Sequence, residues 1–104
     1  MPQRRVRPAG PPPRAPDDPR LRRAVAELAA IVRAAHPEAR FGPPAYDDVE
    51  GLWMVEAYTD ADDPLRVAEL TSAREAELLI EEGLLVAMIP MPLALWSDER
   101  ASSP

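Results

Sequence analysis

Three aspartates, Asp60, Asp62 and Asp63, lie close together near the middle of the chain and are its strongest candidates for chemistry. Carboxylates that follow a strand can bind Mg²⁺ or Ca²⁺ through their oxygens. Their spacing lacks the glycine and the distant glutamate of a calcium-binding loop. Asp63 is followed by Pro64, and this pair is typical of a helix start, where the aspartate caps the helix. We therefore expect a capping cluster and keep the aspartates as weak metal candidates.

Other catalytic chemistry has few residues available. The chain has no cysteine and one histidine, His36. Without cysteine there is no disulfide, no thiolate metal site and no cysteine nucleophile, and one histidine excludes a site with several histidine ligands. His36 has no serine or aspartate motif around it. It directly precedes Pro37 and so lies in the last turn of a predicted helix. A histidine at this position interacts favourably with the negative end of the helix dipole. We therefore expect a structural histidine, no catalytic residue and no cofactor.

Charge divides the chain into two unlike parts. Residues 1–23 contain seven arginines and two aspartates, and residues 24–104 contain five arginines and sixteen acids, so net charges of +5 and −11 combine to −6. The acidic part is expected to repel nucleic acid, whereas the basic part can attract phosphates or an acidic partner. The candidate contact residues of this part are Arg4, Arg5, Arg7 and Arg14.

The segment 88–96 is apolar and contains Pro90 and Pro92. Prolines two residues apart in a strand remove N–H donors from the same side, so this part of the strand must lie at a sheet edge or leave the sheet. The apolar residues around it either close over the core of the domain or contact a second subunit or another protein. The candidate interface residues are Met54, Tyr58, Met91, Leu93, Leu95 and Trp96.

Two segments have the patterns of helices. Between residues 20 and 36, apolar residues recur every three or four positions, which marks one face of a helix. Asp18 fits its N-cap, and Pro37 ends it. A second helix is predicted over residues 64–82, and Gly83 fits the left-handed cap that ends many helices.

Three segments have the patterns of strands: residues 39–42, 52–59 and 84–89. Residues 43–51 are rich in proline, aspartate and glycine and are predicted to form a turn. Along residues 52–59 side chains alternate between two faces, and Glu56 interrupts one of them. The inward face is therefore expected to be that of Trp53, Val55 and Ala57.

The first half of the predicted domain has a loose resemblance to a known family. A helix, the sequence Arg-Phe-Gly at residues 40–42 and a strand together resemble the small nucleotidyltransferases of toxin–antitoxin pairs. That family follows its first strand with Gly-Ser and has two carboxylates on the next strand, which hold Mg²⁺ and the nucleotide. Here Pro43 follows the glycine, and the positions of the carboxylates hold Leu52, Trp53 and Met54. The resemblance therefore implies an inactive relative, and we assign no family.

The predicted order is helix, strand, strand, helix, strand. This order indicates a two-layer α+β sandwich, in which both helices cover one face of a three-stranded sheet. The domain is predicted over residues 20–96, with disordered segments at residues 1–19 and 97–104. A sheet with open edges and an apolar outer face, carrying Met54 and Tyr58, favours self-association.

Our leading hypothesis is a small, cytoplasmic, non-enzymatic module that acts through protein–protein contact and forms a homodimer. Two alternatives remain open. One is a nucleic-acid-associated or antitoxin-like regulator that uses the basic segment, and the other is a divergent metal-dependent enzyme that uses the aspartate cluster. No membrane contact is expected, because the apolar segment 88–96 is shorter than the about 20 residues that span a bilayer.

Overall fold

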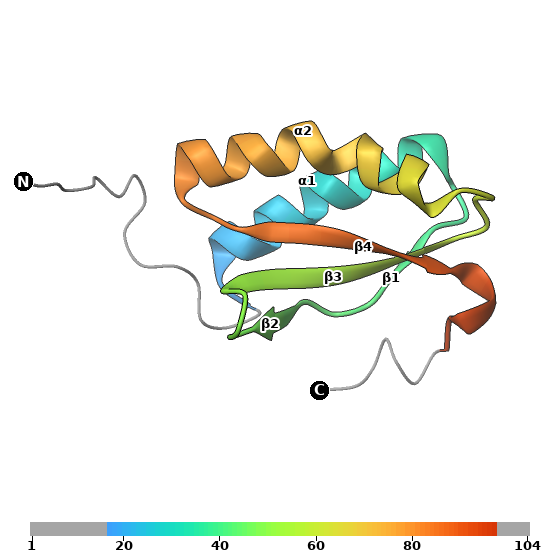
Figure 1. Cartoon of the computed structure of the whole chain (residues 1–104), viewed down its shortest axis with the longest axis horizontal. Helices are drawn as coiled ribbons and strands as arrows, with labels where there is room; N and C mark the ends of the chain where they lie inside the picture. Colours follow the sequence, from blue (N-terminus) through green and yellow to red (C-terminus); the bar gives the residue numbers. More distant parts are fainter. Residues whose placement is uncertain (1–16, 98–104) are drawn as a thin grey trace, which may run out of the picture.

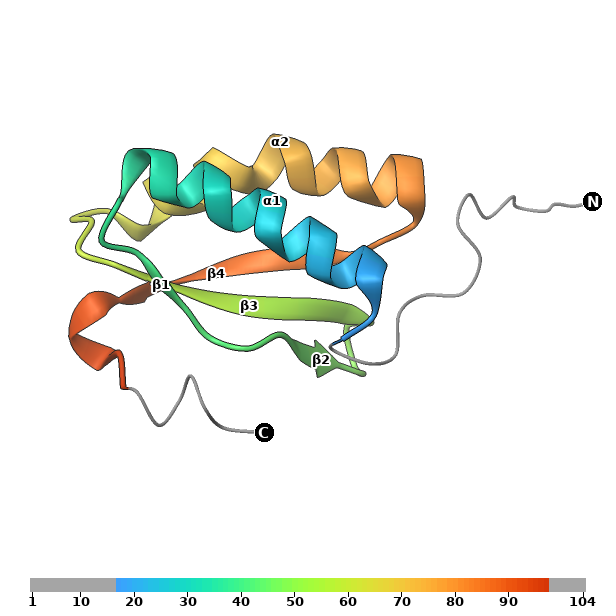
Figure 2. The same ribbon diagram turned by 180° about the vertical axis from the view of Figure 1, so that it is seen from behind.

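The structure, a computed structural model, describes residues 17–97 and has two α-helices and a four-stranded sheet. The elements are α1 (Pro19–Ala35), β1 (Arg40–Phe41), β2 (Ala45–Asp47), β3 (Leu52–Thr59), α2 (Pro64–Glu82), β4 (Val86–Pro92) and the 3₁₀ helix η1 (Leu93–Leu95). Both α-helices lie on one face of the sheet, and within residues 17–97 the opposite face carries no α-helix (Figures 1 and 2). The predicted two-layer α+β architecture is confirmed.

The capping residues set where the helices begin and end. The Asp18 carboxylate accepts a hydrogen bond from the Arg20 N–H (2.9 Å), and the Asp63 carboxylate accepts one from the Leu65 N–H (3.0 Å). Helix α2 ends at Gly83, whose φ of 64° is left-handed and favours glycine. Helix α1 runs from Pro19 to Ala35, so each of its ends lies one residue before the predicted limits of 20 and 36. The other predictions for the two terminal segments concern residues 1–16 and 98–104, outside the described part of the chain.

Strand β3 is the central strand of the sheet. Strands β1 and β2 pair antiparallel with its two halves, and β4 pairs with it in parallel. Strand β2 lies inside the segment 43–51 that we predicted as a turn, so the sheet has one more strand than expected. The prolines at positions 43 and 44 separate β1 from β2 and divide one antiparallel row into two short strands.

The core lies between the sheet and the two helices. Trp53, Val55 and Ala57 are almost completely buried, so the predicted inward face of β3 is confirmed. They pack with buried residues of both helices and of the β4 segment, among them Leu21, Ala24, Leu28, Leu78, Leu84, Val86 and Met88. A smaller cluster of Val32, Ala39 and Val67 adds to the core and includes the loop after α1.

Strand β4 lies at an edge of the sheet, as its prolines require. The Trp53 N–H donates to the Leu85 carbonyl (3.0 Å), so the peptide groups of odd-numbered β4 residues face β3 and those of even-numbered residues face outward. Pro90 and Pro92 therefore have no N–H on the outward side, and the Met88 N–H donates to the Glu75 carboxylate of α2 (3.0 Å). From residue 88 to residue 92, the outer edge offers no free N–H to an added strand.

Candidate functional site

The sheet surface opposite the helices, which we call the helix-free face, is mostly apolar. Strand pairing and the alternation of side chains assign to it Arg40, Ala45, Asp47, Leu52, Met54, Glu56, Tyr58, Ala87, Ile89 and Met91. Met54, Ile89 and Met91 are only half-buried, although β3 and β4 are paired along their lengths. No α-helix of residues 17–97 covers these side chains (Figure 1).

Few charged groups interrupt the helix-free face. The Asp47 carboxylate accepts hydrogen bonds from the backbone N–H groups of Val49 (2.9 Å) and Glu50 (3.3 Å). The Glu56 carboxylate accepts a hydrogen bond from the Tyr58 hydroxyl. Both carboxylates therefore already interact within the chain, and Arg40 is the single cation of this face.

The position of Tyr58 corrects one of our interface predictions. Tyr58 is on the helix-free face of β3, as alternation requires, but it is fully buried. The Trp96 ring, which follows η1, contacts the Tyr58 ring edge-on with 5.2 Å between ring centres. The reason is that the chain turns at η1 directly after β4, which brings the following Trp96 into contact with the Tyr58 ring. Tyr58 is therefore core rather than exposed surface.

The remaining candidate interface residues lie around this covered tyrosine. Met91 and Met54 are half-buried, and so are Leu93 and Trp96. Leu95 is 54% exposed. The segment after β4 thus covers one end of the helix-free face and presents Leu95 to solvent.

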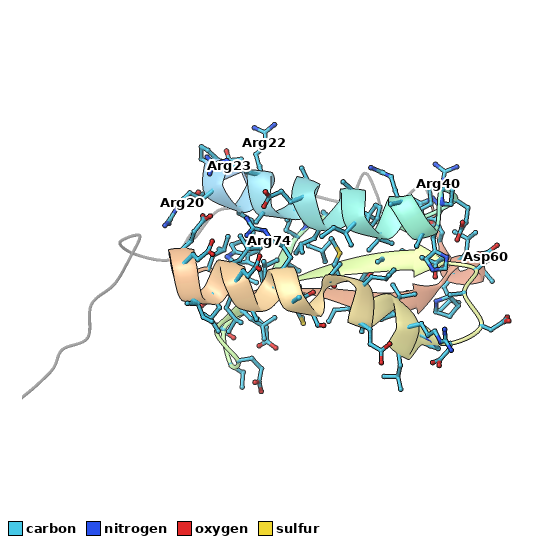
Figure 3. All side chains as sticks on the ribbon, turned by 90° about the horizontal axis from the view of Figure 1, so that it is seen from above. Arg20, Arg22, Arg23, Arg40, Asp60 and Arg74 are labelled. Carbon is cyan, nitrogen blue, oxygen red and sulfur yellow. The ribbon has the colours of Figure 1, made fainter. Side chains whose placement is uncertain are left out.

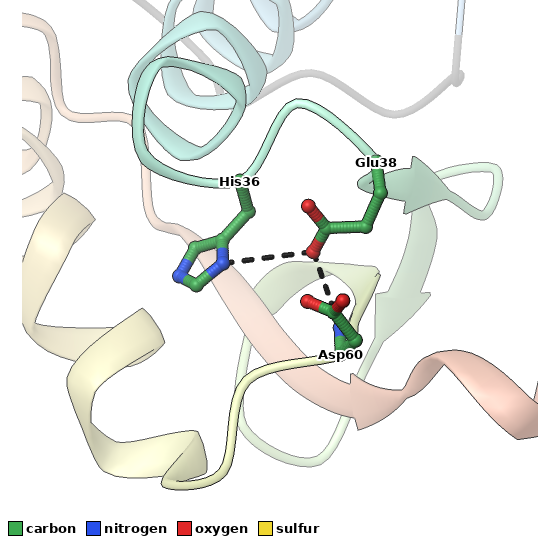
Figure 4. A group of neighbouring side chains, drawn as sticks. All are labelled: His36, Glu38 and Asp60. Atoms are coloured by element: carbon green, nitrogen blue, oxygen red, sulfur yellow. Dashed lines mark hydrogen bonds and ion pairs between the residues drawn. The ribbon is translucent and has the colours of Figure 1, made fainter.

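A second group of functional side chains lies where two loops meet, after α1 and after β3 (Figure 4). His36 is the C-cap of α1, and its backbone N–H donates to the Val32 carbonyl (2.8 Å). The Ala39 N–H donates to the His36 carbonyl (2.9 Å), which closes a tight turn around Glu38. Asp60 directly follows β3. The topology therefore brings side chains together that lie more than twenty residues apart in sequence.

These three side chains converge. The Glu38 Oε2 atom lies 3.6 Å from the His36 Nδ1 atom and accepts a hydrogen bond from the Asp60 backbone N–H (3.2 Å). One ligand atom from each of His36, Glu38 and Asp60 lies within 4.8 Å of the other two. The hydrogen bond with the Glu38 side chain raises the pKa of the Asp60 carboxyl. Hydrogen bonds, first with its own backbone and then with the Asp60 side chain, lower the pKa of the Glu38 carboxyl.

The predicted cluster of Asp60, Asp62 and Asp63 separates in the structure. Asp63 caps α2, as expected. Asp62 and Asp63 line an open pocket of about 780 Å³ between the two loops and the start of α2, together with His36 and Arg66. Of the three aspartates, only Asp60 belongs to the converging group.

Two of the converging residues were not predicted as ligands. His36 was expected to be structural, and Glu38 was not singled out. The contact of Asp60 with residues more than twenty positions earlier depends on the pairing of β1 with β3, and no short sequence motif predicts this pairing.

Four of the seven arginines of the described part, Arg20, Arg22, Arg23 and Arg74, lie toward the end of the molecule away from Asp60, whereas Arg40 lies beside Asp60 (Figure 3). Arg74 of α2 contacts the carboxylates of Glu27 (3.0 Å), Glu77 (3.1 Å) and Glu81 (3.7 Å). Hydrogen bonds with Glu27 and Glu77 raise the Arg74 pKa. The charge of Arg74 is thus matched within the chain. The predicted phosphate-contacting residues Arg4, Arg5, Arg7 and Arg14 lie outside the described residues.

Neither helix of the part that the structure describes is long and apolar enough to cross a membrane. No protein-family model matches the chain, and no curated protein or solved structure matches it either. The function must therefore be inferred from the geometry of the chain itself.

Proposed function

We propose that the protein is a small, non-enzymatic interaction module that pairs with a second copy of itself through the helix-free face. The observation that supports this proposal is the half-buried state of Met54, Ile89 and Met91 in a sheet that helices cover on one side only. Burial of apolar surface stabilises a protein or a complex by about 25 cal/mol per Å². A domain of this size buries a smaller share of its surface on folding than a large domain does. Further burial in a dimer would therefore add usefully to its stability. The proposal includes the cytoplasmic location expected from the sequence.

The distribution of charge favours a second copy as the occupant. Residues 17–97 contain seven arginines and sixteen acids, a net charge of −9, so two copies repel each other over most of their surface. The helix-free face carries one arginine and two hydrogen-bonded carboxylates, and repulsion there is smallest.

A two-fold interface uses the same patch on both subunits and must be self-complementary. Arg40 lies on β1 at the border of the helix-free face, opposite Tyr58, whereas Glu56 lies on the central strand. A copy related by two-fold rotation can therefore bring its Arg40 toward the Glu56 of its partner. The apolar side chains of the helix-free face supply the area.

The edges of the sheet are poorer surfaces for association. The outer edge of β4 has no free N–H between residues 88 and 92, because of its two prolines and the Glu75 contact. Strand β2 is only three residues long. Pairing through added strands is therefore disfavoured, and contact between sheet faces is preferred.

Helix α2 also exposes apolar side chains, with Leu65 at its start and the neighbouring pair Leu79 and Ile80 near its end. Leu65 is 70% and Ile80 is 76% exposed. They lie fifteen residues apart, roughly 22 Å along the helix. Small groups of exposed apolar residues that lie this far apart are normal on protein surfaces and need no partner.

Replacement of Ile89 by glutamate tests this proposal. The charge would enter the centre of the proposed interface, whereas the matched control, Ile80→Glu, places the same charge on the outer surface of α2. We expect wild type and Ile80→Glu to have twice the 11.4 kDa chain mass in light scattering at micromolar concentration, and Ile89→Glu to have the single chain mass. Circular dichroism checks that both variants fold. A monomeric wild type, or a dimeric Ile89→Glu, would overturn the proposal.

A further inference from the structure

We infer that His36, Glu38 and Asp60 form a binding site for a divalent transition-metal ion, with Zn²⁺ as the best match. The group offers one imidazole nitrogen and two carboxylates, whose ligand atoms lie within 4.8 Å of one another. Ca²⁺ and Mg²⁺ prefer oxygen ligands alone, whereas Zn²⁺ binds histidine together with aspartate or glutamate. The nitrogen therefore separates this site from a simple acidic surface.

The distances are close to those that a metal ion requires. Bonds of about 2.0–2.2 Å in a tetrahedral zinc site place neighbouring ligand atoms about 3.4 Å apart. The His36 Nδ1 and Glu38 Oε2 atoms are 3.6 Å apart. The Asp60 side chain is exposed, so a small rotation of this side chain is enough to bring its oxygen into range.

The backbone around the group holds these ligands in place. The Asp60 N–H donates to Glu38 Oε2 (3.2 Å), and contacts of this kind orient the ligands of metal sites. The two loops that carry the ligands also pack on the same small core cluster. Ala39 of the first loop belongs to this cluster with Val32 and Val67, and Ala61 of the second loop packs against it. The side chains of His36 and Glu38 are 22% and 30% exposed, so an ion can reach them.

The pocket beside the group leaves space for a further ligand. His36 belongs to the converging group and also lines the pocket of about 780 Å³. Three protein ligands fill all but one position of a tetrahedral ion, and a water or a small molecule takes the fourth. An ion bound to His36 therefore lies beside an open pocket.

The competing explanation is an ordinary ion pair, in which a protonated His36 contacts Glu38 and no metal binds. His36 is the only histidine of the chain, so its imidazole gives a single, assigned set of NMR signals. We propose titration of the full chain with ZnCl₂, followed by calorimetry and by the imidazole signals, with MgCl₂ as the comparison ion.

Three variants decide between the two explanations. His36→Ala and Asp60→Ala each remove one ligand, and Asp62→Ala removes a neighbouring pocket carboxylate that lies outside the group. We expect one Zn²⁺ per chain, a shift of the imidazole signals, and binding weakened by about tenfold or more in the first two variants only. Absence of binding heat, equal affinity in wild type and His36→Ala, or Mg²⁺ binding as tight as Zn²⁺ binding would each overturn the inference. Circular dichroism confirms that the variants fold.

Discussion

Glu75 connects helix α2 to the outer strand of the sheet. Its Oε2 atom accepts hydrogen bonds from the Thr71 hydroxyl (2.8 Å) and from the Met88 backbone N–H (3.0 Å). Thr71 is fully buried. One carboxylate thus accepts from an N–H group at the sheet edge and from a buried hydroxyl, whose other acceptor is the more distant Ala68 carbonyl (3.4 Å).

Replacement of Glu75 by alanine should destabilise the domain by about 2 kcal/mol, because a buried polar group without a partner carries a cost of this size. Glu75→Gln keeps a carbonyl acceptor and should lose less. The matched control, Glu69→Ala, removes an exposed glutamate of the same helix. Urea denaturation measures the free energies of unfolding. Equal stability of Glu75→Ala and Glu69→Ala would show that the Glu75 contacts contribute nothing.

The pKa of Asp60 predicts a pH-dependent loss of stability. Its carboxyl has a raised pKa in the folded state, because it is hydrogen-bonded to Glu38 and lies close to it. The folded chain therefore holds this proton more tightly than the unfolded chain, and stability falls as the pH rises from the ordinary value of 3.8 through the raised pKa. The lowered pKa of Glu38 has the opposite effect below its ordinary value of 4.5.

Asp60→Asn should remove this loss. In the presence of a chelator, we expect the variant to melt higher than wild type at pH 7, where Asp60 is charged, and close to wild type at pH 3, where it is protonated. Asp48→Asn, on the exposed turn before β3, serves as control. Thermal melts followed by circular dichroism at both pH values measure the effect. A lower melting temperature of Asp60→Asn at pH 7 would contradict the assigned electrostatics.

At the scale of elements, β4 combines two protections of its outer edge. Pro90 and Pro92 remove N–H donors, and Glu75 occupies the donor of Met88. An edge strand with free donors is a template for pairing with other chains.

Replacement of both prolines by threonine should therefore promote aggregation. Threonine has a β-branched side chain that suits a strand, and the two substitutions restore two outward N–H groups. Static light scattering during a temperature ramp is expected to rise earlier for the double variant than for wild type. As control, Pro64→Ala removes a proline from the first turn of α2, away from the sheet edge. An unchanged onset in the double variant would mean that the prolines do not protect this edge.

Elements with strong local signals were predictable from the sequence. The limits of α2 agree with prediction because Asp63 and Gly83 cap its ends, and those of β3 agree because its side chains alternate over eight residues. Strand β2 was missed because it is three residues long and is defined only by its pairing with β3. Its neighbouring prolines and aspartates are typical of turns.

Contacts between distant elements were harder to predict. Alternation placed Tyr58 on the correct face of β3, but the cover from Trp96 depends on the turn at η1, which has no periodic signal. The convergence of Asp60 with His36 and Glu38 depends in the same way on β1 pairing with β3. The sequence contains the residues of both sites, and the topology decides which of them meet.

At the scale of the whole molecule, the described part has two layers, a sheet and the two helices on one face of it. Most of its acidic residues lie away from the helix-free face. The converging group of His36, Glu38 and Asp60 lies in the loops after α1 and β3 (Figure 4), whereas the helix-free face spans the sheet (Figure 1). Metal binding and self-association can therefore be tested separately.

The isoleucines of the chain provide the most direct test of self-association. There are three, Ile31, Ile80 and Ile89, so selective methyl labelling gives three NMR signals. Ile89 is on the helix-free face, Ile80 is exposed on α2, and Ile31 packs at the border of the core. In a dilution series of wild-type protein, we expect the Ile89 signal to shift with concentration while the Ile80 signal stays fixed. Three signals that stay unchanged, or a shift confined to Ile80, would contradict it.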